Sequence, residues 1–459
     1  MFSSGSPSDL KWSMRVYPSV VAGGGVARWL SVAPRTERAS TVLVLAGAGL
    51  VLSAACWGLA LVPNLVLAPR VFLVLFTVAW LAYGGGVLVT AQLRGPVTVG
   101  VILTVAVLSR LLLLPALPSL STDVYRYVWD ARVSNAGIDP YAYAPVAPEV
   151  AGLRDADIYP RLNHPTWRTV YPPVAQALFR AVYRVAPDNV FALKAAFGLA
   201  ELLAFAALAF LLRTLGIPLG RLTIYAWNPL LLVEIWGSGH LDALVLATVT
   251  TAALASARGR DGIAAMLLAV GTLVKLYPAV LLLLLPRGRR ASAYALFGIV
   301  IIAGTTTAGG LGHWPIMPMW RYVSGEYFNP GLVRSLVNEP LAALAATAIW
   351  VAVIAWRARA GSLAERAAPM IAGVVVLGAN VFPWYVVWLV PFLAVRPSIS
   401  LIVFTGTVGF AYSFFLSEPW TIPVWARLLE VAPLAIAAAV NLKEAIGWLP
   451  SLRLRARAG

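Results

Sequence analysis

Long apolar runs separated by short polar breaks fill most of this chain. Runs near 42–62, 71–90 and 98–118 are each long enough to cross a hydrocarbon layer roughly 30 Å thick as one helix. Several later runs are too short to cross alone, which favours broken or re-entrant helices around a protein cavity. The pattern predicts an all-α polytopic membrane protein with about 12–14 transmembrane or re-entrant helices and short helices in its outer loops. The later runs lie near 191–212, 222–236, 241–257, 262–286, 291–310, 340–356, 367–380, 383–396, 398–416 and 422–441.

The basic residues divide the chain into a membrane domain, 41–445, and two flanking segments. Cytoplasmic loops carry an excess of Lys and Arg, so residues 1–40 and the basic tail 446–459 are predicted to lie in the cytoplasm. Residues 1–40 contain no short apolar region followed by a small-residue cleavage site, and the first helix is therefore expected to act as an uncleaved anchor.

Two longer polar segments, 119–190 and 311–339, interrupt the apolar runs and are predicted to be outer loops. Segment 119–190 holds seven Lys or Arg and seven Asp or Glu, so it has no basic bias. The run 262–286 has basic residues at both ends, and basic residues favour the cytoplasmic side. Both ends can lie on that side only if the run is a hairpin that breaks at 271–278. That hairpin places Lys275 on the outer side with both polar segments.

Composition supports this class of protein and excludes others. Hydrophobic residues make up 60% of the chain, the mean hydropathy is +0.81 and the formal charge is +16. In a membrane protein such a charge is typical of cytoplasmic Lys and Arg and of attraction to anionic lipids. The basic residues form no continuous stripe, which argues against nucleic-acid binding. A single cysteine, Cys56, excludes a disulfide framework and a cysteine-based metal site.

The stretch "STDVYRYVWDARVSNAGIDPYAYAP", 121–145, concentrates ionisable residues just after an apolar run. A helix is predicted from a Ser121 or Thr122 cap to "NAG" at 135–137. Arg126 lies three residues after Asp123 and four before Asp130, so simple ion pairs within the helix are one interpretation. Asp123 lies where a membrane-embedded site would meet a lipid head group. We interpret it as functional because ionisable groups at membrane depth are costly and usually serve a purpose.

Other polar positions among the apolar runs are candidates for substrate contacts, each with a structural alternative. His240 and Asp242 could bind a metal, orient a proton carrier or contact a phosphate, or they could satisfy a helix end at the "GSG" turn. Lys275 suits an anionic phosphate, unless it only extends its amine to the membrane interface. The remaining candidates are Tyr171 for a sugar, Asn329 in a loop that could be merely solvated, and Trp384 with Tyr385, where interface packing competes with sugar stacking or prenyl contact.

Six motifs together resemble the polyprenyl-phosphate-sugar-dependent integral membrane glycosyltransferases, which have the GT-C fold. The resemblance runs from about residue 100 to 415 and is nearest to the bacterial polyprenol-phosphate-mannose-dependent mannosyltransferases. Relatives often carry "HND" where this chain has "HLD" (240–242), and "HPWY" where it has "FPWY" (382–385). The motifs are "STDVYRYVWDARVSNAGIDPYAYAP", "TVYPP", "NPLLLVEIWGSGHLDAL", "KLYP", "EYFNPG" and "FPWYVVWLVP".

The resemblance implies a bacterial plasma-membrane enzyme whose site faces the extracytoplasmic side. Asp123 would act as general base in an inverting transfer of a sugar, mannose in the nearest relatives, from a polyprenyl-phosphate donor to a lipid-linked or glycan acceptor. We expect Lys275, His240 and Arg126 to neutralise the donor phosphate and Asp130 or Asp242 to hold acceptor hydroxyls. No metal is required, although Mg²⁺ or Mn²⁺ on Asp123 and Asp130 is conceivable. Arabinofuranosyl or other glycosyl transfer, and a transporter or flippase of a lipid-linked sugar, are the alternatives.

Overall fold

The computed structural model describes residues 38–90, 95–286, 288, 290–307, 314–357 and 362–447. Almost all regular structure in these residues is helical, and an isolated antiparallel bridge joins Pro330 to Asn380. The predicted cytoplasmic segment 1–40 and tail 446–459 lie almost wholly outside the described residues, as do Arg287 and Arg289 of the "RGRR" sequence. Seven described helices are long and apolar enough to cross a membrane, and three shorter ones are also apolar. The prediction of an all-α polytopic membrane protein is therefore confirmed.

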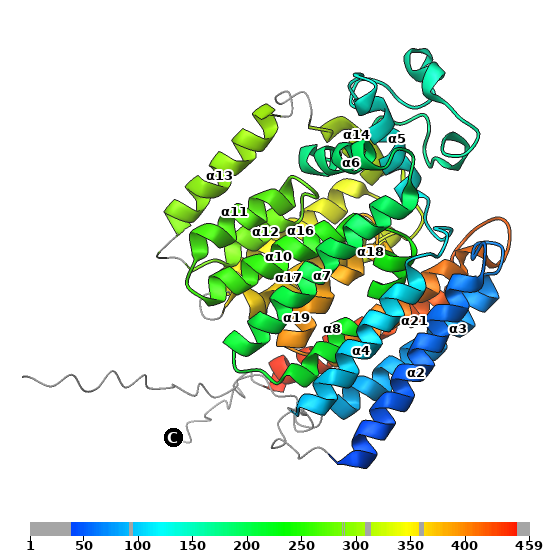
Figure 1. The fold of residues 1–459 in the computed structure, drawn as a ribbon. Helices are drawn as coiled ribbons and strands as arrows, with labels where there is room; N and C mark the ends of the chain where they lie inside the picture. Colours follow the sequence, from blue (N-terminus) through cyan, green and yellow to red (C-terminus); the bar gives the residue numbers. More distant parts are fainter. Residues whose placement is uncertain are drawn as a thin grey trace, which may run out of the picture.

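The first three helices of the described residues form a layer along one side of the molecule (Figure 1). These are α2 (Ala39–Leu61), α3 (Pro69–Thr90) and α4 (Pro96–Leu113), which follow the three predicted spans closely. Both α3 and α4 pack against α2, and many of the remaining apolar side chains are exposed, as expected of surfaces that face lipid.

The long polar segment after α4 folds into short helices that gather at one end of the molecule (Figure 1). They are α5 (Asp123–Asn135), η1 (Pro148–Leu153), η2 (Tyr159–Arg161) and α6 (Pro173–Val185). α5 has almost the predicted limits. Its chain reverses at Gly137, whose φ of +80° suits glycine because it has no Cβ.

The central helices are interrupted where the sequence predicted short or broken spans. α7 (Val190–Thr214) is followed by the short helix η3 (Leu219–Arg221). The predicted span 222–236 is then divided between three short helices, which are α8 (Leu222–Ala226), α9 (Pro229–Leu231) and the π-helix η4 (Leu232–Gly237). α10 (Asp242–Ala257) packs against α7 and α11. α11 (Asp261–Thr272) ends before Lys275, and α12 (Pro278–Leu281) with η5 (Leu282–Leu284) follows, which confirms the predicted break.

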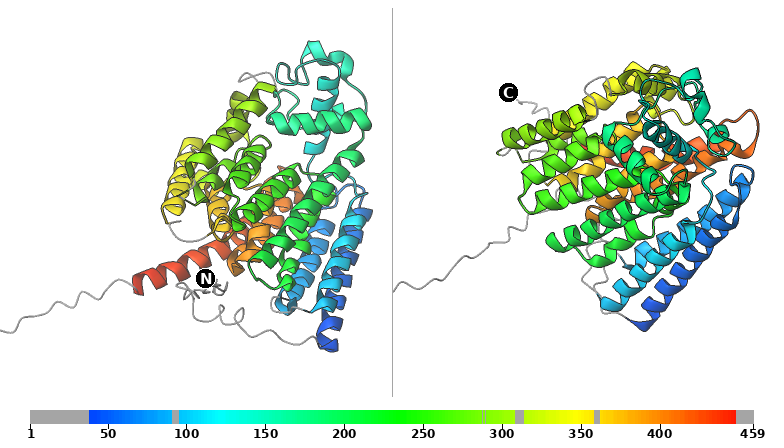
Figure 2. Two further views of the ribbon diagram at one scale, coloured as in Figure 1. Left: turned by 60° about the vertical axis from the view of Figure 1, so that its left-hand side comes forward. Right: turned by 45° about the horizontal axis from the view of Figure 1, so that its top comes forward.

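Some of the later helices flank the central group, and others pass through the middle of the molecule (Figure 2). The later helices are α13 (Arg290–Thr307), α14 (Ile316–Gly325), α15 (Leu332–Val337), α16 (Pro340–Arg357), α17 (Leu363–Leu377), α18 (Pro383–Val386), η8 (Val387–Leu389), α19 (Val390–Val395), α20 (Ile399–Thr407), η9 (Val408–Leu416) and α21 (Val424–Gly447). α14 of the second polar segment lies at the same end of the molecule as α5 and α6 (Figure 1). The described parts of the two polar segments therefore lie at the same end of the molecule.

A buried ion pair ties three of these elements together. Arg110 Nη2 on α4 lies 2.6 Å from Glu201 Oε1 on α7, and the indole of Trp236 on η4 donates to Glu201 Oε2 at 3.1 Å. All three side chains are buried. Charges inside apolar segments are tolerated when they are paired in this way, and here they fix the position of η4 beside the site.

Candidate active site

Asp123 is the first residue of α5, and its position is fixed by an almost wholly buried helix. The Ser121 hydroxyl accepts a hydrogen bond from the Asp123 backbone N–H at 3.3 Å, whereas the N-cap residue Thr122 makes no side-chain capping hydrogen bond, so the predicted cap is not formed. Residues 124–133 of α5 are buried, whereas the Asp123 side chain keeps 18% of its surface exposed. The helix therefore presents one carboxylate at its outer end.

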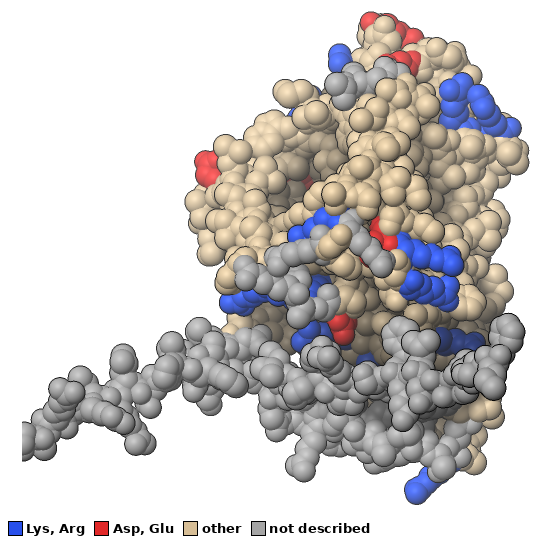
Figure 3. Space-filling view, turned by 90° about the vertical axis from the view of Figure 1, so that its left-hand side faces the viewer, with Lys and Arg blue, Asp and Glu red and all other residues tan. Residues whose placement is uncertain are grey.

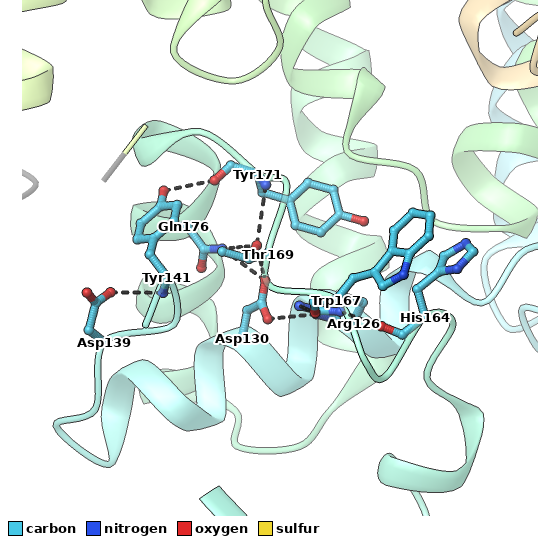
Figure 4. A network of polar contacts seen from close by, with 9 residues as sticks. All are labelled: Arg126, Asp130, Asp139, Tyr141, His164, Trp167, Thr169, Tyr171 and Gln176. Atoms are coloured by element: carbon cyan, nitrogen blue, oxygen red, sulfur yellow. Dashed lines mark hydrogen bonds and ion pairs between the residues drawn. The ribbon is translucent and has the colours of Figure 1, made fainter. Parts of the chain in front are cut away.

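A polar network on the next turns of α5 holds the outer segment in place (Figure 4). Asp130 Oδ1 accepts from Arg126 Nε at 2.9 Å, and Oδ2 accepts from the Thr169 hydroxyl at 2.5 Å and from Gln176 Nε2 at 2.9 Å. Arg126 Nη2 also donates to the Trp167 carbonyl at 2.9 Å. Asp130 thus connects α5 to α6 and to the segment before it.

Asn163 and His240 flank the Asp123 carboxylate. Asn163 Nδ2 donates to Asp123 Oδ1 at 2.5 Å, and His240 Nδ1 lies 3.8 Å from Oδ2 without hydrogen-bond geometry. His240 is buried in the turn between η4 and α10, where Gly239 adopts a φ of +74° and where a Cβ would meet Lys194 Cγ at 2.8 Å. The indole of Trp384 stacks on the imidazole at 4.3 Å. Burial, and secondarily the charge of Lys275, lower the pKa of His240 well below its ordinary value.

Asp242 and Lys275 form an ion pair at the first turn of α10. Lys275 Nζ lies 2.7 Å from Asp242 Oδ1 and 2.8 Å from Oδ2, and Trp388 Nε1 donates to Oδ1 at 2.5 Å. The Lys275 amine also lies 4.5 Å from the centre of the Tyr385 ring. The lysine charge is therefore balanced by a carboxylate and covered by aromatic rings.

The first cavity, of about 460 Å³, extends from Asp123 toward the later helices. Most of its lining is apolar or aromatic, from α12, α14, α16, α17 and α18. Three cationic side chains, Arg126, Arg168 and Lys275, also line it. Arg168 is exposed, and the structure gives it no hydrogen bond or ion pair within the described part of the chain. One end of the cavity thus combines positive charge with a long apolar wall.

The second cavity, of about 590 Å³, also reaches Asp123. Its walls include Asn64, Ser119, Arg161, Glu326 and the exposed Trp420. Six residues line both cavities: Asp123, Asn163, His164, Tyr322, Phe382 and Trp384. The carboxylate therefore lies in a wall that the two cavities share.

Burial raises the pKa of the Asp123 carboxyl above its ordinary value. The charge of Lys275 and the hydrogen bond from Asn163 act in the opposite direction, and the charge of Asp242 adds to the effect of burial. A carboxylate with a raised pKa is a stronger base than an exposed one, which suits proton abstraction from a hydroxyl group.

Ten residues were predicted from the sequence as catalytic or substrate-binding, and the structure divides them into two groups. Asp123, Arg126, Tyr171, Lys275, Trp384 and Tyr385 line one or both cavities. Asp130, His240, Asp242 and Asn329 line neither and are buried. Asn329 Nδ2 instead donates to the Val381 carbonyl at 2.7 Å and to Glu430 at 3.0 Å. For these four residues substrate contact stays a prediction, because none of their side chains lines either cavity.

Sequence reasoning missed Asn163, His164, Trp167 and Arg168, which form one short irregular segment. His164 carried a usable signal, because the chain has only 3 histidines. A lone asparagine or arginine in a polar loop carries none.

A Mg²⁺ or Mn²⁺ ion on Asp123 and Asp130, the alternative to a reaction that requires no metal, does not fit the side chains. Both oxygens of Asp130 already accept hydrogen bonds, and they come from Arg126, Thr169 and Gln176. Among the described residues no group of three or more His, Cys, Asp or Glu side chains is arranged to hold a metal ion.

Comparison with known proteins identifies the family. Residues 13–286 match the family described as "Alpha-(1->6)-mannopyranosyltransferase, N-terminal domain". The chain belongs to this family. The match to the mannopyranosyltransferase family includes α5, Asn163, His240 and Lys275, and it ends before α13. The sequence-based resemblance to membrane mannosyltransferases is therefore confirmed.

A curated relative of this mannopyranosyltransferase family is Alpha-(1->6)-mannopyranosyltransferase A from Mycobacterium tuberculosis. It is 28% identical over 171 residues, which are 36% of this chain and 32% of the relative. The matched part thus spans about a third of the relative's length.

Proposed function

We propose that the protein transfers a mannosyl residue from a polyprenyl-phosphate donor to a hydroxyl group of a lipid-linked or glycan acceptor, with Asp123 as general base. The observation that carries this proposal is the position of Asp123 in the wall between two cavities. A group-transfer enzyme must bring its two substrates together with its base beside the acceptor hydroxyl, and two cavities that meet at Asp123 allow this.

The first cavity has the chemistry of a donor site. Its apolar wall, which includes Val280, Met319, Leu344 and Val374, suits a prenyl chain. Asp130 and Asp242 balance the charges of Arg126 and Lys275. Arg168 therefore supplies positive charge that no described carboxylate compensates, and it is our candidate for direct contact with the phosphate.

The second cavity has the chemistry of an acceptor site. It combines hydroxyl and amide groups of Ser119, Thr122 and Asn64 with the charged side chains Arg161 and Glu326 and several aromatic rings. Polar groups that orient hydroxyls, together with rings that cover apolar sugar faces, are typical of carbohydrate binding.

The reaction follows from these positions as a single displacement. Asp123 takes the proton of the acceptor hydroxyl as the oxygen attacks the anomeric carbon. The bond from that carbon to the phosphate oxygen breaks, and polyprenyl phosphate leaves with the electron pair. Positive charge around the donor cavity stabilises the phosphate as its charge increases. Attack opposite to the leaving group inverts the anomeric centre, so a β-linked donor gives an α-linked product. The sequence then favours mannose over arabinofuranose because the family is a mannopyranosyltransferase family.

The distribution of charge supports an extracytoplasmic site. On the face shown in Figure 3, most Lys and Arg side chains lie toward the end opposite to α5 and α14, and a hollow opens above them. Because cytoplasmic loops carry the excess of Lys and Arg, the end that holds Asp123 then faces away from the cytoplasm of a bacterial plasma membrane.

Transfer of label tests the proposal. Purified protein in lipid nanodiscs would receive radiolabelled polyprenyl-phosphate mannose, and in parallel polyprenyl-phosphate arabinofuranose and glucose, with a membrane-lipid and glycan extract as acceptor. The proposal expects label from the mannose donor in an α-linked product. Transfer from another donor alone would change the sugar. Movement of the intact lipid-linked sugar across reconstituted vesicles, with no label in any acceptor, would favour the transporter alternative and contradict the proposal.

A further inference from the structure

We propose that Asn163 is a positioning residue: its side-chain amide holds the Asp123 carboxylate in place and stabilises its charged form. This inference rests on the proposed function. Asn163 Nδ2 donates to Asp123 Oδ1 at 2.5 Å, and Asn163 lines both cavities beside the carboxylate. The two residues lie 40 positions apart, so the contact depends on the fold of the outer segment and not on local helix geometry.

The segment that carries Asn163 is held from several directions. The next residue, His164, has a φ of +46°, and its carbonyl accepts from the Trp167 backbone N–H at 2.9 Å. The His164 ring stacks on Trp167 at 4.2 Å, and Nε2 lies 3.0 Å from Glu326 Oε2 on the second outer segment. Arg126 of α5 fixes the Trp167 carbonyl (Figure 4). The Asn163 amide is therefore already oriented toward the carboxylate. The two side chains lose little conformational freedom when the base acts in each catalytic cycle.

The amide has a role that no neighbouring cation fills. Lys275 forms its ion pair with Asp242 and reaches Asp123 only through its field, while His240 lies 3.8 Å away and is not hydrogen-bonded. Asn163 is the side chain that donates a hydrogen bond to the carboxylate within the described residues. A donor to the charged form favours ionisation, and it limits the increase that burial causes in the carboxyl pKa. Asp242 and His164 also act on this carboxyl through their charges. The carboxylate charge acts in turn on Glu234, Tyr127, Tyr171, Tyr322, Tyr385 and Tyr412, which face it.

The test compares Asn163→Ala and Asn163→Asp with wild type and with Asn135→Ala as matched control. Asn135 lies in the same outer segment, at the end of α5, and donates only to backbone carbonyls. The readout is the pH profile of kcat for mannosyl transfer at saturating donor. At low pH, kcat should fall as Asp123 becomes protonated, and we call this part of the profile the acid limb. Loss of the hydrogen bond should move the acid limb to higher pH by about one unit. Asn163→Asp should move it further, because two carboxylates in contact oppose ionisation. KM for donor and acceptor should stay within about twofold, since the mutated group acts on the base.

An infrared titration separates this inference from the proposed function. The carboxyl stretch of protonated Asp123 is the band that disappears in Asp123→Asn, and its midpoint can be measured without any transfer. A midpoint that rises from wild type to Asn163→Ala to Asn163→Asp supports the inference even if mannosyl transfer fails. If neither variant changes the infrared midpoint of Asp123 or the acid limb of kcat, the role of Asn163 is overturned. The transferase proposal would then remain intact. Asn163→Asp is nearly the same size as the native residue, so it keeps the test decisive if the alanine variant does not fold.

Discussion

His164 and Glu326 join the first outer segment to the second across the region that the two cavities share. Their side chains approach to 3.0 Å, and Glu326 Oε1 also accepts the backbone N–H groups of Tyr327 at 3.0 Å and Phe328 at 2.9 Å. Burial alone would raise the pKa of Glu326, but the hydrogen bond from His164 and those backbone donors lower it. Both residues line the second cavity, so their contact sets the width of that cavity next to Asp123.

We therefore predict that Glu326→Ala raises KM for the acceptor several-fold. The substitution releases the second outer segment from His164, and both residues line the second cavity. Steady-state kinetics with varied acceptor measures this effect, and Glu339→Ala, an exposed position of the same segment, is the matched control. Equal acceptor KM values for the two variants would show that the contact does not shape the acceptor site.

The ion pair of Lys275 and Asp242 should contribute strongly to stability. Lys275→Met leaves a fully buried carboxylate without its cation, which typically lowers the free energy of unfolding by about 3–5 kcal/mol. The double variant Lys275→Met/Asp242→Asn removes both charges and should recover a large part of this loss. Thermal unfolding in the same detergent measures both. The interpretation is contradicted if the single and double variants unfold at one temperature.

The rate of transfer should fall as the solution becomes more acidic. Asp123 can accept a proton only when it is ionised, and burial raises its pKa, so the ionised fraction decreases as pH falls through that raised value. The acid limb of kcat should accordingly lie above about 3.9, the pKa of an exposed aspartate. A pH series with the integrity of the protein checked at each point measures the limb. A rate that stays constant down to that value would exclude Asp123 as the titrating base.

Arg168 should contribute to donor affinity. Its charge has no described partner, and a charge-assisted hydrogen bond to phosphate is typically worth about 1.5–3 kcal/mol, so Arg168→Gln should weaken donor binding by about 10- to 100-fold. Arg180→Gln is the control, because Arg180 is also exposed on the outer segment but lines neither cavity. Binding of a labelled polyprenyl phosphate without sugar isolates the phosphate contact. Equal affinity in both variants would assign the phosphate to another cation.

Local patterns in the sequence predicted the elements that hold the site. The end of the helix Asp123–Asn135 follows from the terminal "NAG" sequence, and the break after Thr272 follows from the placement of basic residues around one apolar run. Asp123 itself could be selected because a carboxylate at the end of an apolar run is costly unless it has a function.

The contacts between distant segments could not be predicted in the same way. Asp130 receives its partners from Thr169 and Gln176, which are 39 and 46 positions away. Its i,i+4 spacing with Arg126 indicated the local ion pair but not the connection to α6. Asn163 carries no pattern at all, because one amide in an irregular segment resembles any solvated loop residue. Its role becomes visible only when the fold places it against Asp123.

The most direct test of the account is single-turnover mannosyl transfer by wild type, Asp123→Asn and Asp157→Asn, with donor binding measured on each. Asp157 is an exposed aspartate in the same outer segment and serves as the control. The account predicts that Asp123→Asn binds the donor as wild type does but transfers mannose about 10²- to 10⁴-fold more slowly, the range of general-base catalysis. Asp157→Asn should match wild type. Transfer by Asp123→Asn at the wild-type rate would contradict the assignment of Asp123 as the base between the two cavities.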